Sequence, residues 1–268
     1  MNIPIVLTIA GSDSGGGAGI QADIKAMQAN GVFAMSVITA ITAQNSVAVT
    51  DAMELPTSII ASQLDAVLSD FPVAGIKTGM LSSSSIIECV AQKLKSVVGV
   101  PLVVDPVMIS KSGFSLLKDE AIAALVELLL PLATMCTPNA HEAARLVGFD
   151  INDEAGARRA SEIIWKMGPS HVLIKGGHLD AEAEAIDVLF DGNTTHVFRA
   201  PRVPTVHTHG TGCTYASTIA ANLALGLSVV EAVESAKNYV TLAIQHGFSF
   251  GKGHGPTDHF YFLRNSRI

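Results

Sequence analysis

The chain has 268 residues, of which 49% are hydrophobic and 15% charged, with a formal net charge of −7 at pH 7. This is enough apolar material for a full core, in one large α/β domain or two small ones. The negative charge argues against general binding of nucleic acid or anionic membranes, which needs a basic surface. Cys89, Cys136 and Cys213 are too few and too scattered for a disulfide framework or a zinc site. Because no apolar run reaches the ~18 residues of a membrane span and residues 1–10 resemble a first strand rather than a leader, we expect a cytoplasmic protein.

Short β-branched runs alternate with amphipathic segments along the chain. The pattern predicts a strand at Ile3–Ile9, a glycine-rich loop and a helix through about Asn30, capped by Gly31. A second strand at Met35–Ile41 precedes a polar loop over Thr42–Asp51. In chain order there follow a helix at 57–69, a strand at 73–77, a helix from 82–85 to about 97, a strand at 102–104, a helix at 119–129 and a strand at 134–136.

The last third begins with helices at His141–Val147 and Glu154–Met167 and a strand at His171–Lys175. Two strands, Ile186–Phe190 and Thr195–Arg199, flank a turn and form a predicted hairpin, and two helices come last. Apolar strands that alternate with helices indicate a parallel sheet covered on both faces. We therefore expect a single α/β domain over residues 1–268, with a central, mostly parallel sheet.

Ligands of such sheets lie beyond the carboxyl ends of the strands. The residues that could support chemistry fall at those ends, namely Gly11, Lys77 to Met80, Asp105, Thr137 to Asn139, and Lys175 to Gly177. Their shared placement predicts one site at this edge of the sheet.

The octet from His207 to Thr214 contains a Gly-Thr-Gly turn that opens a predicted helix. Unpaired N–H groups and the helix dipole favour an anion there. The same position should lower the pKa of Cys213 below the ~8.5 of a free thiol. Together these features suggest phosphoryl transfer to a small alcohol. The alternative is structural, since Gly-x-Gly is common at helix starts and a lone Cys is usually a small core residue.

Four other groups are candidates for binding. Asp23 is either a solvated carboxylate or one that faces a pocket, and Gln44 could offer a donor and an acceptor to a heteroaromatic ring. Asp105 and Glu142 could position a hydrated Mg²⁺, although each could simply be an N-cap or a surface acid. Lys175 ends a strand, where it could reach a phosphate. We assign no chemical role to His178 and His209, and we expect Cys89 and Cys136 to be core residues.

The chain resembles a known family through the following motifs: Ala10 to Asp13, Gly16 to Asp23, Thr39-Ala40 with Gln44-Asn45, Lys77 to Leu81, Asp105 to Met108, Thr137 to Asn139, Lys175 to His178, and Thr208 to Thr214. The family is the hydroxymethylpyrimidine and hydroxymethylpyrimidine-phosphate kinases of thiamine biosynthesis, within the ribokinase-like superfamily. The resemblance runs from about residue 5 to 260. Cys213 stands where sugar-kinase relatives have Asp. The resemblance implies a ribokinase-like three-layer α/β/α fold.

The family's activity would be phosphorylation of 4-amino-5-hydroxymethyl-2-methylpyrimidine and then of its monophosphate, with ATP and Mg²⁺. The resemblance implies that Cys213 is the general base, that Gly210, Thr211 and Gly212 form an anion hole, and that Lys175 neutralises phosphate charge. It places the pyrimidine against Gln44, Gly11, Asp23, Met80 and Val107. It places ATP and the metal near Asp105, Asn139, Glu142 and Thr208, with the metal held by Asp105 and Glu142 through water. Two departures, Gly15 for a frequent Ser and His207 for a frequent Asn, leave these positions untouched.

Three other functions remain open. Related enzymes with this Cys turn accept pyridoxal, so a pyridoxal or pyridoxamine kinase is the nearest rival. A non-catalytic pyrimidine sensor would be expected to lack Lys175, Asp105 or the glycine turn, and all are present. The glycine loop at Gly11–Gly19 matches G-x-G-x-x-G poorly, which disfavours a dinucleotide-dependent oxidoreductase. The resemblance further suggests a homodimer, and the segment Ser110–Ser115 is a candidate flap.

Overall fold

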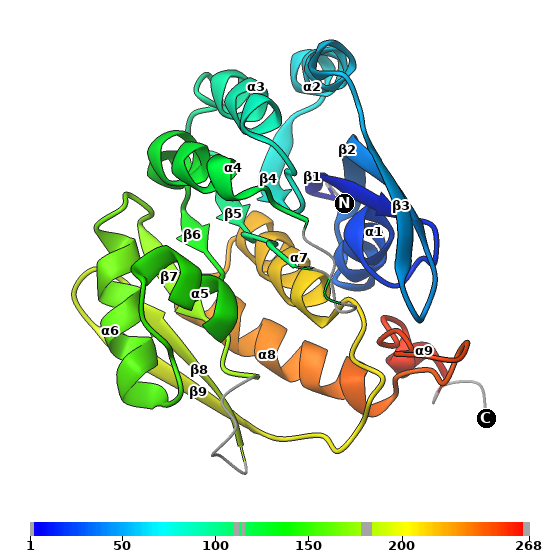
Figure 1. The fold of residues 1–268 in the computed structure, drawn as a ribbon, viewed down its shortest axis with the longest axis vertical. Helices are drawn as coiled ribbons and strands as arrows, with labels where there is room; N and C mark the ends of the chain where they lie inside the picture. The colour runs from blue at the N-terminus through cyan, green and yellow to red at the C-terminus, as the bar shows by residue number, and fades with distance from the viewer. Residues whose placement is uncertain (1–2, 110–112, 114–115, 178–183, 265–268) are drawn as a thin grey trace.

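The computed structural model describes residues 3–109, 113, 116–177 and 184–264. Within these residues, nine strands form one sheet in the order β3-β2-β1-β4-β5-β6-β7-β8-β9 (Figure 1). The strands are β1 (Ile5–Asp13), β2 (Phe33–Gln44), β3 (Val49–Glu54), β4 (Val73–Thr78), β5 (Leu102–Val104), β6 (Met135–Cys136), β7 (His171–Ile174), β8 (Glu184–Phe190) and β9 (Thr195–Pro201). The six strands from β2 to β7 in this order run parallel, and β3, β8 and β9 are antiparallel to their neighbours.

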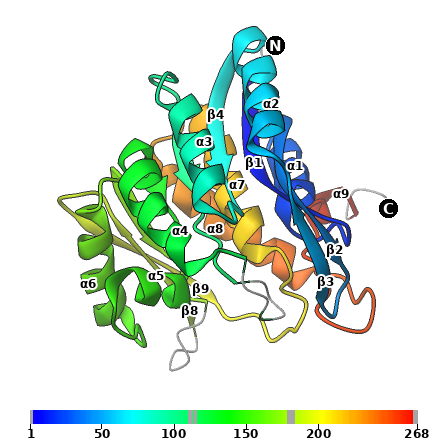
Figure 2. The same cartoon turned by 45° about the horizontal axis from the view of Figure 1, so that its top comes forward.

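Helices cover both faces of the sheet (Figures 1 and 2). Their bounds are α1 (Gly19–Ala29), α2 (Thr57–Asp70), α3 (Ser84–Leu94), α4 (Asp119–Ala124), α5 (Ala140–Val147), α6 (Glu154–Trp165), α7 (Thr211–Ala224), α8 (Val229–Gln245) and α9 (Tyr261–Arg264). Among the described helices, none is both long and apolar enough to cross a membrane.

Two apolar cores lie on opposite faces because successive side chains of a strand point in opposite directions. On β1, Leu7 and Ile9 pack into the core beneath α2 to α6, whereas Val6 packs into the core beneath α1, α7 and α8. The central strands are therefore apolar on both faces, as parallel strands between two helix layers must be. This confirms the predicted α/β fold with its mostly parallel sheet.

The first strand is longer than predicted and reaches Asp13 instead of ending at Ile9. Its register against β2 shifts between Ala10 and Ser12, at Gly11. Glycine inside a strand often marks such an irregularity or the close approach of another group. The sheet thereby carries the start of the glycine loop up to the candidate site.

The predicted polar loop at Thr42–Asp51 is wrong. Strand β2 continues to Gln44, and β3 pairs with it as an antiparallel edge strand. Only Val49 of β3 is buried, so this strand lacks the apolar alternation by which a sequence reveals one. The predicted helix at 119–129 is also shorter, since α4 ends at Ala124 and a π-helical turn follows from Leu125 to Leu129. Helix α9 has no counterpart in the predicted elements.

We predict that His259 makes stability depend on pH. Burial lowers its pKa to about 4, with Lys25 adding to the effect and Asp258 opposing it. The unfolded chain, with a His pKa of about 6.5, binds the proton more readily, so stability present at neutral pH is lost as the pH falls from 6.5 towards 4. Lowering the pH from 7 to 5 should remove about 2 kcal/mol of unfolding free energy through this one group.

Urea unfolding of wild type and His259→Gln at pH 7 and pH 5 measures this contribution as a difference of differences. His254→Gln, which changes an exposed histidine, is the matched control and should follow the wild type. Equal pH dependence in all three proteins would contradict the assignment to His259.

Candidate active site

The glycine turn ahead of α7 lies at the carboxyl edge of the sheet. Gly210 has a φ of +79°, and a Cβ at this position would overlap the carbonyl oxygen of Gly17 in the first loop. A Cβ at Gly212 would come 3.4 Å from the Nζ of Lys175 at the end of β7. The structure therefore brings the predicted anion-binding turn against the predicted phosphate-binding lysine.

Lys175 forms an ion pair with Asp105. Its Nζ donates to Asp105 Oδ1 at 2.6 Å, and the hydroxyl of Thr137 donates to the same oxygen at 3.1 Å. Burial alone would lower the pKa of Lys175, but Asp105 and Glu142 raise it above its usual value. Lys175 is thus a charged, nearly buried cation that already neutralises one carboxylate.

Asn139 and Glu142 form the capping box of α5. The Glu142 amide donates to Asn139 Oδ1 at 2.9 Å, and the Asn139 amide donates to Glu142 Oε2 at 2.8 Å. The capping role that the sequence offered as the alternative for Glu142 is therefore present. The Glu142 carboxylate also lies close to Asp105. Burial raises the pKa of Glu142 to about 7, Lys175 opposes this, and Asp105 adds to it. Two acids in one buried pocket create a position that favours a cation.

Thr208 holds the turn together from the other side. The hydroxyl of Thr211, the first residue of α7, donates to the carbonyl oxygen of Thr208 at 2.8 Å. The Thr211 N–H donates to the same carbonyl oxygen at 3.3 Å, so the loop is closed in front of the helix. The first N–H groups of a helix have no partners inside it. Both residues thus lie at the mouth of the anion-binding turn.

The predicted lowering of the Cys213 pKa is wrong. Burial raises the pKa of this thiol to about 11; Lys77 opposes the rise, while Asp23 and Asp105 add to it. Part of the residue remains exposed, as a reacting group requires. The helix N-terminus is present as predicted, but desolvation and two carboxylates outweigh it.

Asp23 lies beneath the site rather than in its open part. Its carboxylate is fully buried and accepts two hydrogen bonds from Lys77 Nζ at 2.8 and 2.9 Å. The hydroxyls of Thr8 and Ser217 donate to the same carboxylate at 2.6 and 2.7 Å. Ser217 lies one turn after Cys213 on α7, so both side chains share a face of the helix. The ion pair therefore sits directly below Cys213.

Thr8 and Ser217 are structural partners that the sequence reasoning missed. Lys77 was placed among the residues that could support chemistry, but its pairing with Asp23 was not foreseen. Lys77 has no exposed surface, and although burial alone would lower its pKa, the charges of Asp23, Cys213 and Asp105 raise it. The available signal was a lysine inside the otherwise apolar strand β4. A lysine in a strand buried on both faces must have a buried partner.

The structure brings Gly11 and Met80 together, and Gln44 lies beside His209. A Cβ at Gly11 would come 3.0 Å from the Sδ of Met80, so the two residues are in tight contact. Gln44 ends β2, and its Nε2 lies 3.3 Å from the Nε2 of His209. His209 in turn contacts Asp13 at 2.9 Å, so a histidine without a sequence-based role joins the site.

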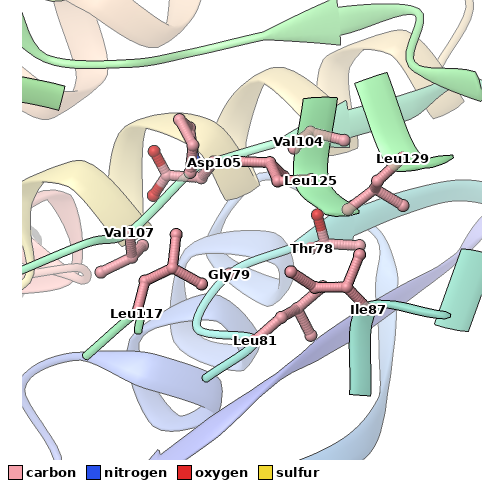
Figure 3. Close-up of a pocket in the computed structure, with 11 residues that line it drawn as sticks. Thr78, Gly79, Leu81, Ile87, Val104, Asp105, Val107, Leu117, Leu125 and Leu129 are labelled. Carbon is pink, nitrogen blue, oxygen red and sulfur yellow. The ribbon is translucent and has the colours of Figure 1, made fainter. Parts of the chain in front are cut away.

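A small cavity of about 10 Å³ lies beside Val107 and Asp105 (Figure 3). The buried hydroxyl of Thr78 lines it and has no hydrogen-bond partner in the described part of the chain. The volume suits a single water molecule. Val107 thus lines the same cavity as Asp105, Thr78 and Gly79. The predicted flap at Ser110–Ser115 lies outside the described residues except for Gly113.

A family model described as phosphomethylpyrimidine kinase matches residues 13–258. The hydroxymethylpyrimidine/phosphomethylpyrimidine kinase of Streptomyces coelicolor is 52% identical over 97% of this chain and 96% of its own. A thiamine biosynthesis bifunctional protein of Geobacter sulfurreducens is 49% identical over 98% of this chain and 53% of its own. The sequence resemblance is confirmed.

Solved structures of two kinds share the fold. The pyridoxal kinase from Staphylococcus aureus in complex with AMP-PCP and pyridoxal matches with a TM-score of 0.91 at 36% identity, covering 98% of this chain and 96% of its own. The phosphomethylpyrimidine kinase from Clostridium difficile matches with a TM-score of 0.80 at 47% identity, covering 90% and 99%. The ribokinase-like fold expected from the sequence is confirmed.

We predict that Lys77→Met lowers the unfolding free energy by about 3–5 kcal/mol, because it leaves the Asp23 carboxylate buried without its counter-charge. Urea unfolding monitored by circular dichroism measures the loss. Lys93→Met is the matched control: it breaks the exposed Lys93–Asp65 pair of 2.6 Å and should cost less than about 1 kcal/mol. Similar costs for the two variants would contradict a structural role for the buried pair.

Proposed function

This chain belongs to the phosphomethylpyrimidine kinase family, and from that premise we propose that it phosphorylates 4-amino-5-hydroxymethyl-2-methylpyrimidine and then its monophosphate in thiamine biosynthesis. ATP is the phosphoryl donor, in keeping with the kinase relatives and the ATP-analogue complexes of the structural neighbours. The observation that carries the proposal is the glycine turn of α7 beside Lys175, with Cys213 in its mouth. An anion site next to a potential base is what transfer of a phosphoryl group to an alcohol requires.

Phosphoryl transfer depends on positioning and on neutralisation of charge. We propose that the N–H groups of Gly210, Thr211 and Gly212 hold the oxygens of the transferred group. Lys175 lies against Gly212, so its ammonium can move from Asp105 to a phosphate oxygen with little displacement. Thr208 and Asn139 would hold the loops on which this geometry depends.

We propose that Cys213 accepts the proton of the substrate hydroxyl. Its raised pKa means that the thiolate is a small fraction of the enzyme at neutral pH, but each thiolate is a strong base. Because bond formation to the incoming oxygen is late in a loose transition state, proton removal need not precede it. The buried Lys77 below Cys213 provides a positive charge that favours the thiolate.

The residues present fit a hydrated Mg²⁺. Within the described residues no group of three or more His, Cys, Asp or Glu could hold a metal ion by itself, but Mg²⁺ needs only one or two carboxylates in addition to phosphate oxygens and water. We propose that Asp105 and Glu142 hold it through water; burial raises the pKa of Glu142 to about 7 and the nearby Asp105 adds to the rise, so a cation between the two carboxyl groups would be favoured. When bound, the ion would neutralise charge on the phosphate oxygens.

For the pyrimidine ring we propose contacts with Gln44, Gly11, Met80 and Val107. Asp23 takes a different role from the one expected from the resemblance. Its oxygens are already engaged by Lys77, Thr8 and Ser217, so we propose that it supports the floor of the site.

Pyridoxal is the second candidate substrate, because the structural neighbours with a TM-score of 0.91 are pyridoxal kinases.

We also propose that residues 1–268 form one kinase domain, which the continuous sheet supports, and that the enzyme works as a homodimer in the cytoplasm. A monomer observed by sedimentation velocity would contradict the proposed homodimer.

ATP consumption by the purified protein, with hydroxymethylpyrimidine, its monophosphate and pyridoxal offered separately, tests the proposal. We expect turnover of both pyrimidines. Added pyridoxal turnover would indicate a permissive ring pocket. Turnover of pyridoxal alone would replace the substrate while keeping the phosphoryl-transfer site, and no turnover with any acceptor would contradict the proposal.

We predict that Cys213→Ala lowers kcat by about 10²- to 10⁴-fold with KM changed less than about threefold. Cys89→Ala is the control and should leave kcat unchanged, since Cys89 lies on α3.

In the wild type, kcat/KM should rise up to about tenfold per pH unit from pH 7 to 10, because the thiolate fraction grows towards a pKa of about 11. A plateau above pH 8 would show a thiol pKa that is not raised, and an unchanged kcat in Cys213→Ala would remove Cys213 from the mechanism.

A further inference from the structure

One nitrogen of His209 faces two different groups. Its Nε2 lies 2.9 Å from Asp13 Oδ2 and 3.3 Å from the amide nitrogen of Gln44. The histidine side chain is 12% exposed and Asp13 is 3% exposed, so water does not mediate these contacts freely. A single ring nitrogen cannot donate its proton to one group and accept a proton from the other.

Asp13 decides which role this nitrogen takes. The carboxylate accepts backbone N–H bonds from Gly15, Gly17 and Ala18 at 2.7, 3.0 and 2.8 Å. Burial alone would raise the pKa of Asp13, but the hydrogen bonds from His209 and these amides lower it. An ionised carboxylate can only accept, so His209 Nε2 carries a proton and donates it to Asp13. No lone pair is left on Nε2 for the N–H of Gln44.

The other end of the Gln44 amide shows the same mismatch. The hydroxyl of Thr42 donates its only hydrogen to the carbonyl oxygen of Ser12 at 2.9 Å. The hydroxyl also lies within donating distance of Gln44 Oε1, at 3.3 Å, but its one hydrogen cannot serve both acceptors. With the hydrogen on the shorter bond to Ser12, the two oxygens of Thr42 and Gln44 face each other as acceptors. A half-turn of the amide about its last bond resolves both mismatches together, because the oxygen then faces the His209 proton and the NH₂ group donates to Thr42.

We propose that His209, held by Asp13, fixes the Gln44 amide with its oxygen towards His209 and its NH₂ towards Thr42, and that this orientation selects rings with an amino group next to a ring nitrogen. The inference rests on the proposed function, which places Gln44 against the ring. With these partners satisfied, the amide retains one lone pair and one N–H side by side. An amino group donates to the first while the adjacent ring nitrogen accepts from the second, so both bonds form with one edge of a 4-aminopyrimidine.

The ring of His209 is held in place for this task. A Cβ at Gly17 would overlap the imidazole, so the glycine loop packs directly on it, and the backbone N–H of His209 donates to the carbonyl oxygen of Gly255 at 3.1 Å. His209 also immediately precedes Gly210. The same residue therefore links the ring side of the site to the phosphate side, and it acts as a positioning residue through Gln44.

The experiment is a double-mutant cycle on ligand binding. Isothermal titration calorimetry gives Kd for the 4-amino-5-hydroxymethyl-2-methylpyrimidine and for the same ring without its amino group, with wild type, His209→Ala, Gln44→Ala and the double variant. We expect the amino compound to lose at least about tenfold preference in each single variant, and no further loss in the double variant, because His209 acts through Gln44. His209→Gln, whose NH₂ can donate to Asp13 and to Gln44, should retain most of the preference. His254→Ala is the control and should match the wild type.

Each result separates the inference from the proposed function. Losses that add in the double variant, or equal weakening of both ligands in His209→Ala, would overturn the positioning role while leaving the kinase intact. Wild-type protein that binds neither ring but phosphorylates pyridoxal would overturn the proposed substrate and the inference with it. In kinetics, a preserved kcat in His209→Ala together with a raised KM for the pyrimidine would support the positioning role of His209.

Discussion

The geometry of the site depends on one buried ion pair, Lys77 with Asp23. Its partners come from β1, α1, β4 and α7, so four elements must be in register before the pair is satisfied. Burying two charges has a large desolvation cost that only close pairing and further hydrogen bonds offset. Displacement of α7 relative to the sheet would remove the Ser217 hydrogen bond from the buried Asp23 carboxylate. The first turn of α7, which carries Cys213 and the anion-binding N–H groups, is therefore held against the strand ends by electrostatics as well as by packing.

The charges around Cys213 are nearly balanced, which makes the site responsive to its ligands. Two lysines, Lys77 and Lys175, stand against three acids, Asp23, Asp105 and Glu142. Burial is the largest cause of the raised Cys213 pKa; Lys77 opposes the rise, and Asp23 and Asp105 add to it. A bound phosphate would draw Lys175 away from Asp105, and a cation near Asp105 and Glu142 would compensate that change. On the proposed function, nucleotide binding and the protonation of Cys213 would be coupled through these buried groups.

Much of this arrangement could be predicted from the sequence because parallel strands place their carboxyl ends along one edge. Asp105 and Lys175 follow different strands and do meet there. The sign of the Cys213 pKa shift could not be predicted, since it depends on burial and on Asp23, which is 190 residues away in the sequence. Asp23 itself looked equally compatible with solvent and with a pocket, because its local surroundings on a helix do not reveal Lys77. Strand β3 was not predicted because an exposed edge strand does not show the alternation of apolar and polar residues that marks a half-buried strand.

The position of α7 late in the chain has a consequence for synthesis. The ribosome delivers β1, α1 and β4 well before residue 211, so Asp23 and Lys77 are present together long before Ser217 can join them. Until then one face of the first strands lacks the helix that completes its apolar core. Closing contacts across so many residues is slow, and incomplete sheets tend to associate with one another. A nascent chain of this enzyme is therefore most vulnerable to aggregation in the interval before its last third has left the ribosome, which is when a chaperone would protect it.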